Sequence, residues 1–277
     1  MKTLRFQLRF LVFLALISAV WTSSMKGEVS VYQVGNSKPL VVFLGGSEGG
    51  YPHISFLVDA FVESDITVAE IGYFGLPNTP KHLSEISVDA ITSKIEKLSE
   101  KHSCVGVLGL SKGAQLALVL ASYKDVSDVT VALAPPNVVW QSSKTSPSKV
   151  SSWTLGGKQM PFVPYKSFSW AAISAALNVD NALALHQNSL KNTEAADRAV
   201  IPVEKIDHPV LLQGAIHDQI WPSSEMENSA FERVERLNPA HKFTLRVYDH
   251  DHYLLRNRSA VDDLFNFLKA ELLNCAK

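Results

Sequence analysis

The chain has 277 residues, 46% of them hydrophobic, which suits one large domain, or at most two small ones, with a substantial core. The formal net charge is -1, and acidic and basic residues are mixed along the chain. This pattern excludes a basic nucleic-acid-binding stripe and a long acidic tail. We therefore expect no nucleic-acid partner, and no attraction of substrate by a strong overall field.

Residues 1–24 have the pattern of a secretory signal peptide. Basic residues are followed by an apolar run over 10–20 and then by a small polar stretch. Cleavage after Ala19 or Ser24 would leave small residues at the cut and a mature domain over 25–277. We expect an exported protein, periplasmic or secreted, with no membrane span after cleavage. The alternative is an uncleaved anchor, although the apolar run is short for a span of roughly 20 residues.

Apolar runs alternate with amphipathic stretches along the mature chain. Strands are predicted at 29–34, 40–46, 66–74, 105–110, 129–134, 209–216 and 243–248. Helices are predicted at 54–64, 84–101, 112–123, 224–237 and 259–273. Several strands are almost continuous Val, Leu and Ile, which is typical of parallel strands covered on both faces. The pattern predicts an α/β fold with a mostly parallel central sheet and helices on both faces.

One long segment, at about 136–205, interrupts this alternation. A connection of this length is more typical of a functional cap than of a structureless loop. Its aromatic residues could equally well serve only to cover the sheet, because apolar side chains usually pack in the core. Those residues are Trp140, Trp153, Phe162, Tyr165, Phe168 and Trp170.

The strongest chemical signal is a G-x-S-x-G motif formed by Gly109, Ser111 and Gly113. It lies between the predicted strand at 105–110 and a predicted helix, which is the setting of a strained turn that raises a nucleophilic serine above a sheet. Glycines two residues before and after the serine remove Cβ atoms that would clash there. The N–H of Lys112, at the helix start, could stabilise an oxyanion. The alternative is a serine in a tight turn without chemistry.

A nucleophilic serine needs a base, and in this fold an acid and then a histidine follow it along the chain. Asp218 comes directly after the strand at 209–216, and His252 comes soon after the strand at 243–248. All three residues then fall at the carboxyl ends of strands, the ligand-binding edge of an open α/β sheet. We expect Asp218 to orient His252, and His252 to act as the base for Ser111.

The segment DHDH at 249–252 leaves two alternatives open. His250 could be the base in place of His252, although an apolar run that starts a helix follows His252. The segment also has the composition of a metal cluster, but no obvious set of further ligands occurs elsewhere. We therefore expect no metal and no cofactor.

A second oxyanion donor is expected in the glycine-rich loop at 45–50. Glycines allow the backbone to approach a ligand closely, so the N–H of Gly46 or Ser47 could face the oxyanion. The same loop could cradle a phosphate, but it lacks the GK[ST] ending of a nucleotide-binding loop. Glu48 is interpreted either as a residue that shapes the pocket or as a solvated acid.

The chain contains only two cysteines, Cys104 and Cys275. Cys104 begins the strand that ends at Ser111, and Cys275 ends a helix that must run back from the active-site edge. Both are therefore expected at the opposite edge of the sheet, where a disulfide is a reasonable hypothesis for an exported protein. The alternative is two separate thiols.

Beyond these single features, the sequence resembles the C-terminal catalytic domain shared by acyl-CoA thioester hydrolases and bile acid-CoA:amino acid N-acyltransferases, which is related to dienelactone hydrolases. The resemblance runs from about residue 40 to 226 and continues more weakly through VYDHDHYLL. The matching stretches are FLGGSEGG, IGYFGLPNTP, LGLSKGAQLALVLAS, SSWTLGGKQMPFVP, IPVEKI and GAIHDQIWPSSEM.

The resemblance implies an α/β-hydrolase that acts on small-molecule acyl esters or thioesters through a covalent acyl-enzyme. It places the family's nucleophile on Ser111, its acid on Asp218 and its histidine on His252. Acyltransferase members carry cysteine at the nucleophile position, so serine implies hydrolysis. The alternatives are a general carboxylesterase or lipase, a dienelactone-hydrolase-like enzyme, and a binding protein that has lost activity.

Overall fold

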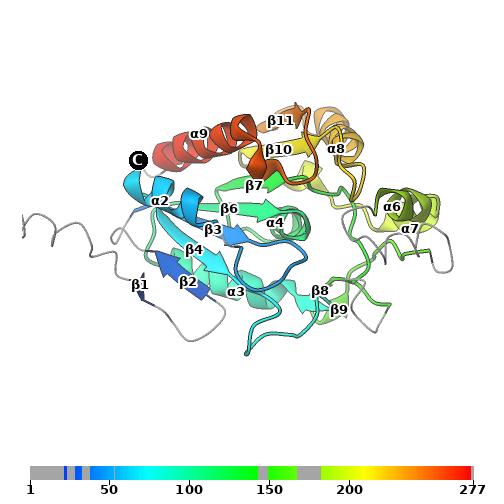
Figure 1. Cartoon of the computed structure of the whole chain (residues 1–277), viewed down its shortest axis with the longest axis horizontal. Coiled ribbons are helices and arrows are strands. Elements are labelled where there is room, and N and C mark those ends of the chain that lie inside the picture. The colour runs from blue at the N-terminus through cyan, green and yellow to red at the C-terminus, as the bar shows by residue number, and fades with distance from the viewer. Residues whose placement is uncertain are drawn as a thin grey trace, which may run out of the picture.

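The computed structural model describes residues 22–23, 29–32, 38–52, 54–142, 149–166 and 182–275. Within them, the central sheet has the strand order β1-β2-β4-β3-β6-β7-β10-β11 (Figure 1). The strands from β4 to β11 run parallel, whereas β1 and β2 pair antiparallel at one edge. Their bounds are β1 Thr22–Ser23, β2 Val29–Tyr32, β3 Leu40–Leu44, β4 Thr67–Ile71, β6 Val105–Leu110, β7 Val129–Leu133, β10 Val210–Ala215 and β11 Phe243–Tyr248.

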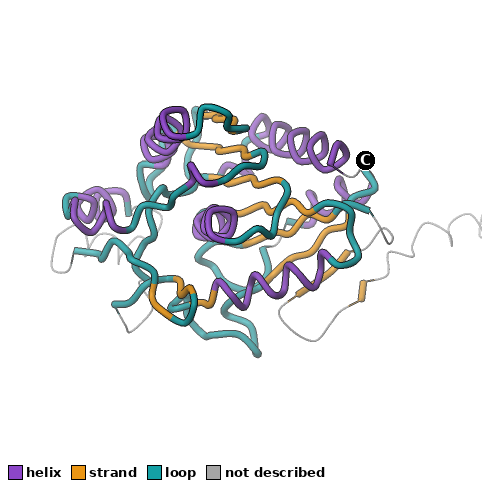
Figure 2. The backbone as a smooth tube through the Cα atoms, turned by 180° about the vertical axis from the view of Figure 1, so that it is seen from behind, coloured by secondary structure: helices purple, strands orange, loops and turns teal. Residues whose placement is uncertain are grey.

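Helices cover both faces of this sheet, as the sequence predicts (Figures 1 and 2). Helices α3 (Val88–Ser99), α4 (Lys112–Tyr123) and α8 (Ser223–Leu237) contribute to the apolar core on one face, while α2 (Ser55–Glu63) and α9 (Arg258–Cys275) contribute to the core on the other. Strand β3 shows why its sequence is apolar throughout: Leu40 and Leu44 enter the first core and Phe43 enters the second.

Four elements of the insertion at 136–205, α6, α7, β8 and β9, lie beyond the carboxyl ends of the strands (Figure 1). Trp153 is buried and its Nε1 donates to Gln115 Oε1 on α4 at 2.7 Å, so this aromatic residue anchors the insertion. Phe168 and Trp170 lie outside the described residues. The elements of the insertion are β8 (Trp153–Leu155), β9 (Lys158–Gln159), α6 (Leu183–Leu190), α7 (Thr193–Arg198) and the 3₁₀ turn η1 (Val203–Lys205). Strands β8 and β9 form a small second sheet with β5 (Ile86–Ser87), which comes directly before α3.

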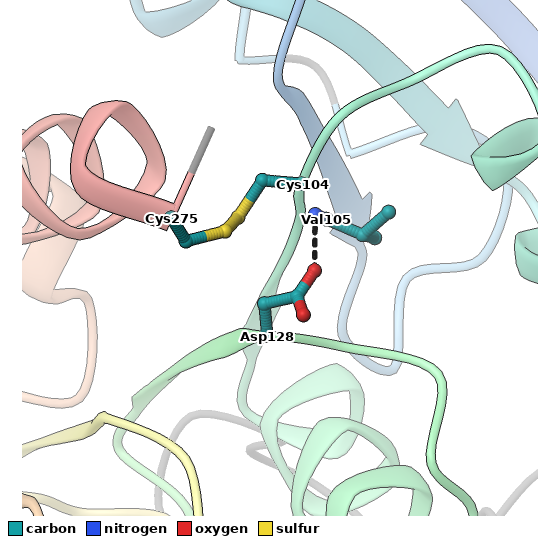
Figure 3. The surroundings of a disulfide bond; sticks show 4 residues. All are labelled: Cys104, Val105, Asp128 and Cys275. Carbon is teal, nitrogen blue, oxygen red and sulfur yellow. Dashed lines mark hydrogen bonds between the residues drawn. A yellow bond between two sulfur atoms is a disulfide. The ribbon is translucent and has the colours of Figure 1, made fainter. Parts of the chain in front are cut away.

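At the amino ends of the parallel strands, opposite the insertion, Cys104 and Cys275 form a disulfide with Cα atoms 6.0 Å apart (Figure 3). The hypothesis that these two residues pair is confirmed. The bridge fastens the end of α9 to the start of β6. Asp128 lies beside it and accepts the N–H of Val105 at 2.8 Å, which ties the same strand to the loop before β7.

The predicted signal peptide falls almost entirely outside the described residues. Its two described residues, Thr22 and Ser23, form β1 and pair with Tyr32 and Val31 of β2. In the part of the chain that the structure describes, no helix is both long enough and apolar enough to cross a bilayer.

Candidate active site

Ser111 lies at the sharp turn between β6 and α4, with a backbone φ of 53°. This left-handed conformation is unusual for a residue other than glycine and marks stored strain. Gly109 and Gly113 make the turn possible: a Cβ on Gly109 would overlap the carbonyl of Gly113, and a Cβ on Gly113 would overlap that of Leu44. The predicted role of both glycines is confirmed, and the serine side chain is raised at the carboxyl edge of the sheet.

The structure brings Ser111, His252 and Asp218 together in one hydrogen-bonded chain. His252 Nε2 lies 2.9 Å from Ser111 Oγ, and His252 Nδ1 lies 2.7 Å from Asp218 Oδ2. The side chains of His252 and Asp218 are only 7% and 1% exposed, so both lie largely out of water. With the carboxylate at Nδ1, the proton stays on that nitrogen and Nε2 is left as an acceptor for the serine proton.

Trp221 is a site residue that was not predicted. Its backbone N–H donates to Asp218 Oδ1 at 3.2 Å, and its ring stands perpendicular to the His252 ring with centroids 5.1 Å apart. Its Nε1 donates to the carbonyl of Ala134, at the end of β7, at 3.1 Å. This buried side chain therefore connects the loops that carry the acid and the histidine. The only signal in the sequence is its position in GAIHDQIWP, three residues after Asp218.

The neighbouring histidines have other partners. His250 Nδ1 lies 3.0 Å from Asp251, and His217 Nε2 lies 2.7 Å from Asp249. His250 therefore pairs with its neighbour in sequence and His217 with an acid of the other loop, whereas His252 pairs with Asp218. Of the two candidate bases, His252 is the one within hydrogen-bond reach of Ser111.

The backbone and the side chain of Lys112 have different roles. As the first residue of α4 it carries a backbone N–H with no acceptor inside the helix, next to the nucleophile. Its side chain turns away into the interior, where Nζ donates to the Gln141 carbonyl at 3.1 Å and to Ser152 Oγ at 2.8 Å. Burial lowers the pKa of this ammonium well below its usual value. The side chain thus joins the turn at Ser111 to the inserted segment.

The predicted oxyanion loop lies against Ser111, but one of its donors is occupied. A Cβ on Gly46 would lie 3.3 Å from Ser111 Cβ, so this residue borders the nucleophile. The N–H of Gly46 donates to Glu48 Oε1 at 2.8 Å. Tyr73 supports the loop from below, where its buried hydroxyl donates to the carbonyl of Gly45 at 2.5 Å. Ser47, the other predicted donor, is exposed on the same turn.

A second buried carboxyl group lies behind the acid. Glu227 on α8 is 1% exposed and packs against Gly214 of β10. Within the described residues, neither of its carboxyl oxygens has a hydrogen-bond partner. Burial, and then the charge of Asp218, raise the pKa of Glu227 well above its usual value. Burial therefore favours the neutral form of this side chain.

This fold places the chain in the class of α/β-hydrolases. The esterase Pf2001 of Pyrococcus furiosus matches with a TM-score of 0.59 and 16% identity over 87% of this chain and 86% of that one. A monoacylglycerol lipase of Paleococcus ferrophilus matches with a TM-score of 0.54 and 17% identity over 91% and 100%. The acylaminoacyl peptidase of Pyrococcus horikoshii matches with a TM-score of 0.60 and 12% identity over 91% and 41%.

The family narrows this class further. Residues 89–255 match the family described as BAAT / Acyl-CoA thioester hydrolase C terminal, and the chain belongs to it. The matched segment contains Ser111, Asp218 and His252. The sequence has no significant match among curated proteins. Family and fold together make the chain an α/β-hydrolase of the esterase and thioester hydrolase kind.

Proposed function

We propose that the protein hydrolyses acyl esters or thioesters of small molecules through an acyl-enzyme on Ser111. The observation that carries the proposal is the hydrogen-bonded chain from Ser111 Oγ through His252 to Asp218, with distances of 2.9 and 2.7 Å. A serine is activated when a base lies within hydrogen-bond distance of its hydroxyl and a third group orients that base. Its position in the matched family segment supports the same role.

In the proposed reaction, Ser111 Oγ attacks the carbonyl carbon while His252 Nε2 takes the serine proton. The negative charge on the former carbonyl oxygen is stabilised by the N–H of Lys112 and by an N–H of the turn at Gly46 and Ser47. His252 then gives its proton to the leaving alcohol or thiol. A water molecule, deprotonated by the same nitrogen, then attacks the acyl-enzyme, and His252 returns this proton to Ser111 Oγ as the bond to the acyl group breaks and the acid product leaves.

We also propose that the protein is exported and acts outside the cytosol. The disulfide between Cys104 and Cys275 supports this location, because such bonds persist in oxidising compartments and are rare in the cytosol. Coenzyme A thioesters are cytosolic, so we propose an acyl group carried on another alcohol or thiol. This agrees with the predicted signal at residues 1–24.

The decisive test is covalent labelling together with turnover. We expect a fluorophosphonate probe to label the wild-type protein at Ser111 and to leave Ser111→Ala unlabelled. Turnover of p-nitrophenyl esters and acyl thioesters should fall by at least about 10³-fold in Ser111→Ala, because only binding and the oxyanion donors remain. Ser103→Ala, at an exposed serine on the opposite edge, is the matched control and should behave as the wild type. Equal turnover by Ser111→Ala would refute the proposal.

A further inference from the structure

The carboxylate of Glu48 binds the Gly46 N–H, which belongs to the turn proposed to stabilise the oxyanion. Its Oε1 accepts the Gly46 N–H at 2.8 Å. Its Oε2 lies 2.7 Å from the point where a Gly46 Cβ would be, and Ser111 Cβ lies 3.3 Å from the same point. Glu48 and Ser111 therefore lie on either side of Gly46, and both contact the space beside it. A carboxylate here competes with an oxyanion for the same donor, and the two negative charges repel each other.

The surroundings hold this charge in place without neutralising it. In the described part of the chain, no basic side chain forms an ion pair with Glu48. The side chain of Lys112, next to the nucleophile in sequence, turns away into the interior and donates to Gln141 and Ser152. The turn itself is fixed, because the buried Tyr73 hydroxyl donates to the Gly45 carbonyl. Glu48 is exposed, so a substrate can reach its carboxylate.

We propose that Glu48 selects substrates by charge, favouring acyl groups that carry a cationic group within a few atoms of the scissile carbonyl. A substrate cation pairs with the carboxylate and draws it away from the Gly46 N–H, which then becomes available to the oxyanion. A neutral acyl group has to displace the carboxylate without this compensation. An anionic acyl group adds a further repulsion, so the expected order is cationic, then neutral, then anionic.

This inference rests on the proposed function and is tested on p-nitrophenyl esters that share one leaving group. The cationic probe is the ester of 4-(trimethylammonio)butanoate, the neutral probe is its isostere 5,5-dimethylhexanoate, and the anionic probe is the monoester of glutarate. Each kcat/KM is divided by the rate constant for hydroxide hydrolysis of the same ester. Active sites are counted by fluorophosphonate labelling, so a partly misfolded variant does not distort the comparison.

We expect the wild type to prefer the cationic over the neutral ester by about fivefold, the upper range for an exposed ion pair. Glu48→Gln should abolish this preference and raise kcat/KM for the neutral ester, whereas Glu48→Asp, which keeps the charge, should retain a preference of the same sign. Glu63→Gln removes a matched exposed charge at the far end of α2 and should leave all three rates unchanged.

The possible outcomes separate this inference from the proposed function. A wild type with no charge preference, or a Glu48→Gln variant that keeps it, overturns the inference while serine hydrolysis stands. An equal loss on all three esters in Glu48→Gln also overturns it, because Glu48 would then only hold the loop in shape. If Ser111→Ala retained wild-type turnover, or the wild type cleaved none of the esters, the proposed function would fail first.

Discussion

The buried carboxyl group of Glu227 predicts an unusual dependence of stability on pH. Glu227 is 1% exposed, and its pKa is raised well above the usual 4.5 by burial and by the charge of Asp218. Above about pH 4.5 the unfolded chain releases this proton while the folded chain keeps it. The folded state then binds more protons than the unfolded state, so the contribution of this residue to stability falls as pH rises.

The magnitude follows from this difference of one proton. The free energy of unfolding should fall by about 1.4 kcal/mol per pH unit, from about pH 4.5 up to the pKa of Glu227 in the folded protein. Glu227→Gln has nearly the same shape and no proton to lose. Relative to the wild type, this variant should therefore gain stability as the pH rises from 5 to 7, by an amount on the order of 3 kcal/mol.

The assay is urea unfolding of both proteins with the disulfide intact, at half-unit steps from pH 5 to pH 8. The quantity of interest is the difference between the two free energies of unfolding, because other titrating groups then cancel. Glu225→Gln, at an exposed position on the same helix, controls for the loss of a charge from α8 and should show a flat difference. A flat difference for Glu227→Gln as well would refute the reasoning, since it would mean that Glu227 titrates as it does in the unfolded chain.

Two further predictions concern the base and the bridge. His252→Ala should lower kcat/KM for esters by at least about 10³-fold, whereas His250→Ala should lower it by less than about tenfold, since only His252 reaches Ser111. Loss of activity in the His250 variant alone would show that the wrong histidine has been assigned. Replacing Cys104 and Cys275 by serine should lower the free energy of unfolding by about 2–4 kcal/mol with little effect on kcat, because the bridge lies at the far edge of the sheet. Intact mass of the expressed protein after alkylation checks both the bridge and the proposed cleavage after Ala19 or Ser24, and two alkylated thiols without reductant would rule the bridge out.

The central sheet could be predicted because its strands are buried on both faces. Strands β6 and β11 and helix α4 begin and end at the predicted residues. The predicted strands at 40–46, 66–74, 129–134 and 209–216 run slightly too long, because segments such as 45–46 and 72–74 continue the apolar pattern after the chain has left the sheet. The small sheet of β5, β8 and β9 was not predicted, because strands of two or three residues are too short to show a period.

The positions of the candidate site residues could also be predicted, because they follow from topology. In a parallel sheet, residues that directly follow different strands meet at one edge, which brings Ser111, Asp218 and His252 together. What the sequence could not reveal is which partner each side chain takes. The hydrogen bond from Gly46 to Glu48 depends on the path of a single turn. The perpendicular contact of Trp221 with His252 depends on two loops from different strands.

The acids around Ser111 show this limit most clearly. Glu227, like Asp218, lies between the serine and the histidine in the chain and follows the same strand, β10. The order serine, acid, histidine therefore fits both residues. The fold separates them, because Asp218 lies in the loop at the carboxyl edge, where it meets His252 and accepts two backbone N–H groups, whereas Glu227 lies on α8 against the side of β10. Asp218 has three hydrogen-bond partners, whereas burial without partners raises the pKa of Glu227. A carboxylate that orients a histidine must remain charged, so the environment of each acid, more than its place in the sequence, decides which of them can do so.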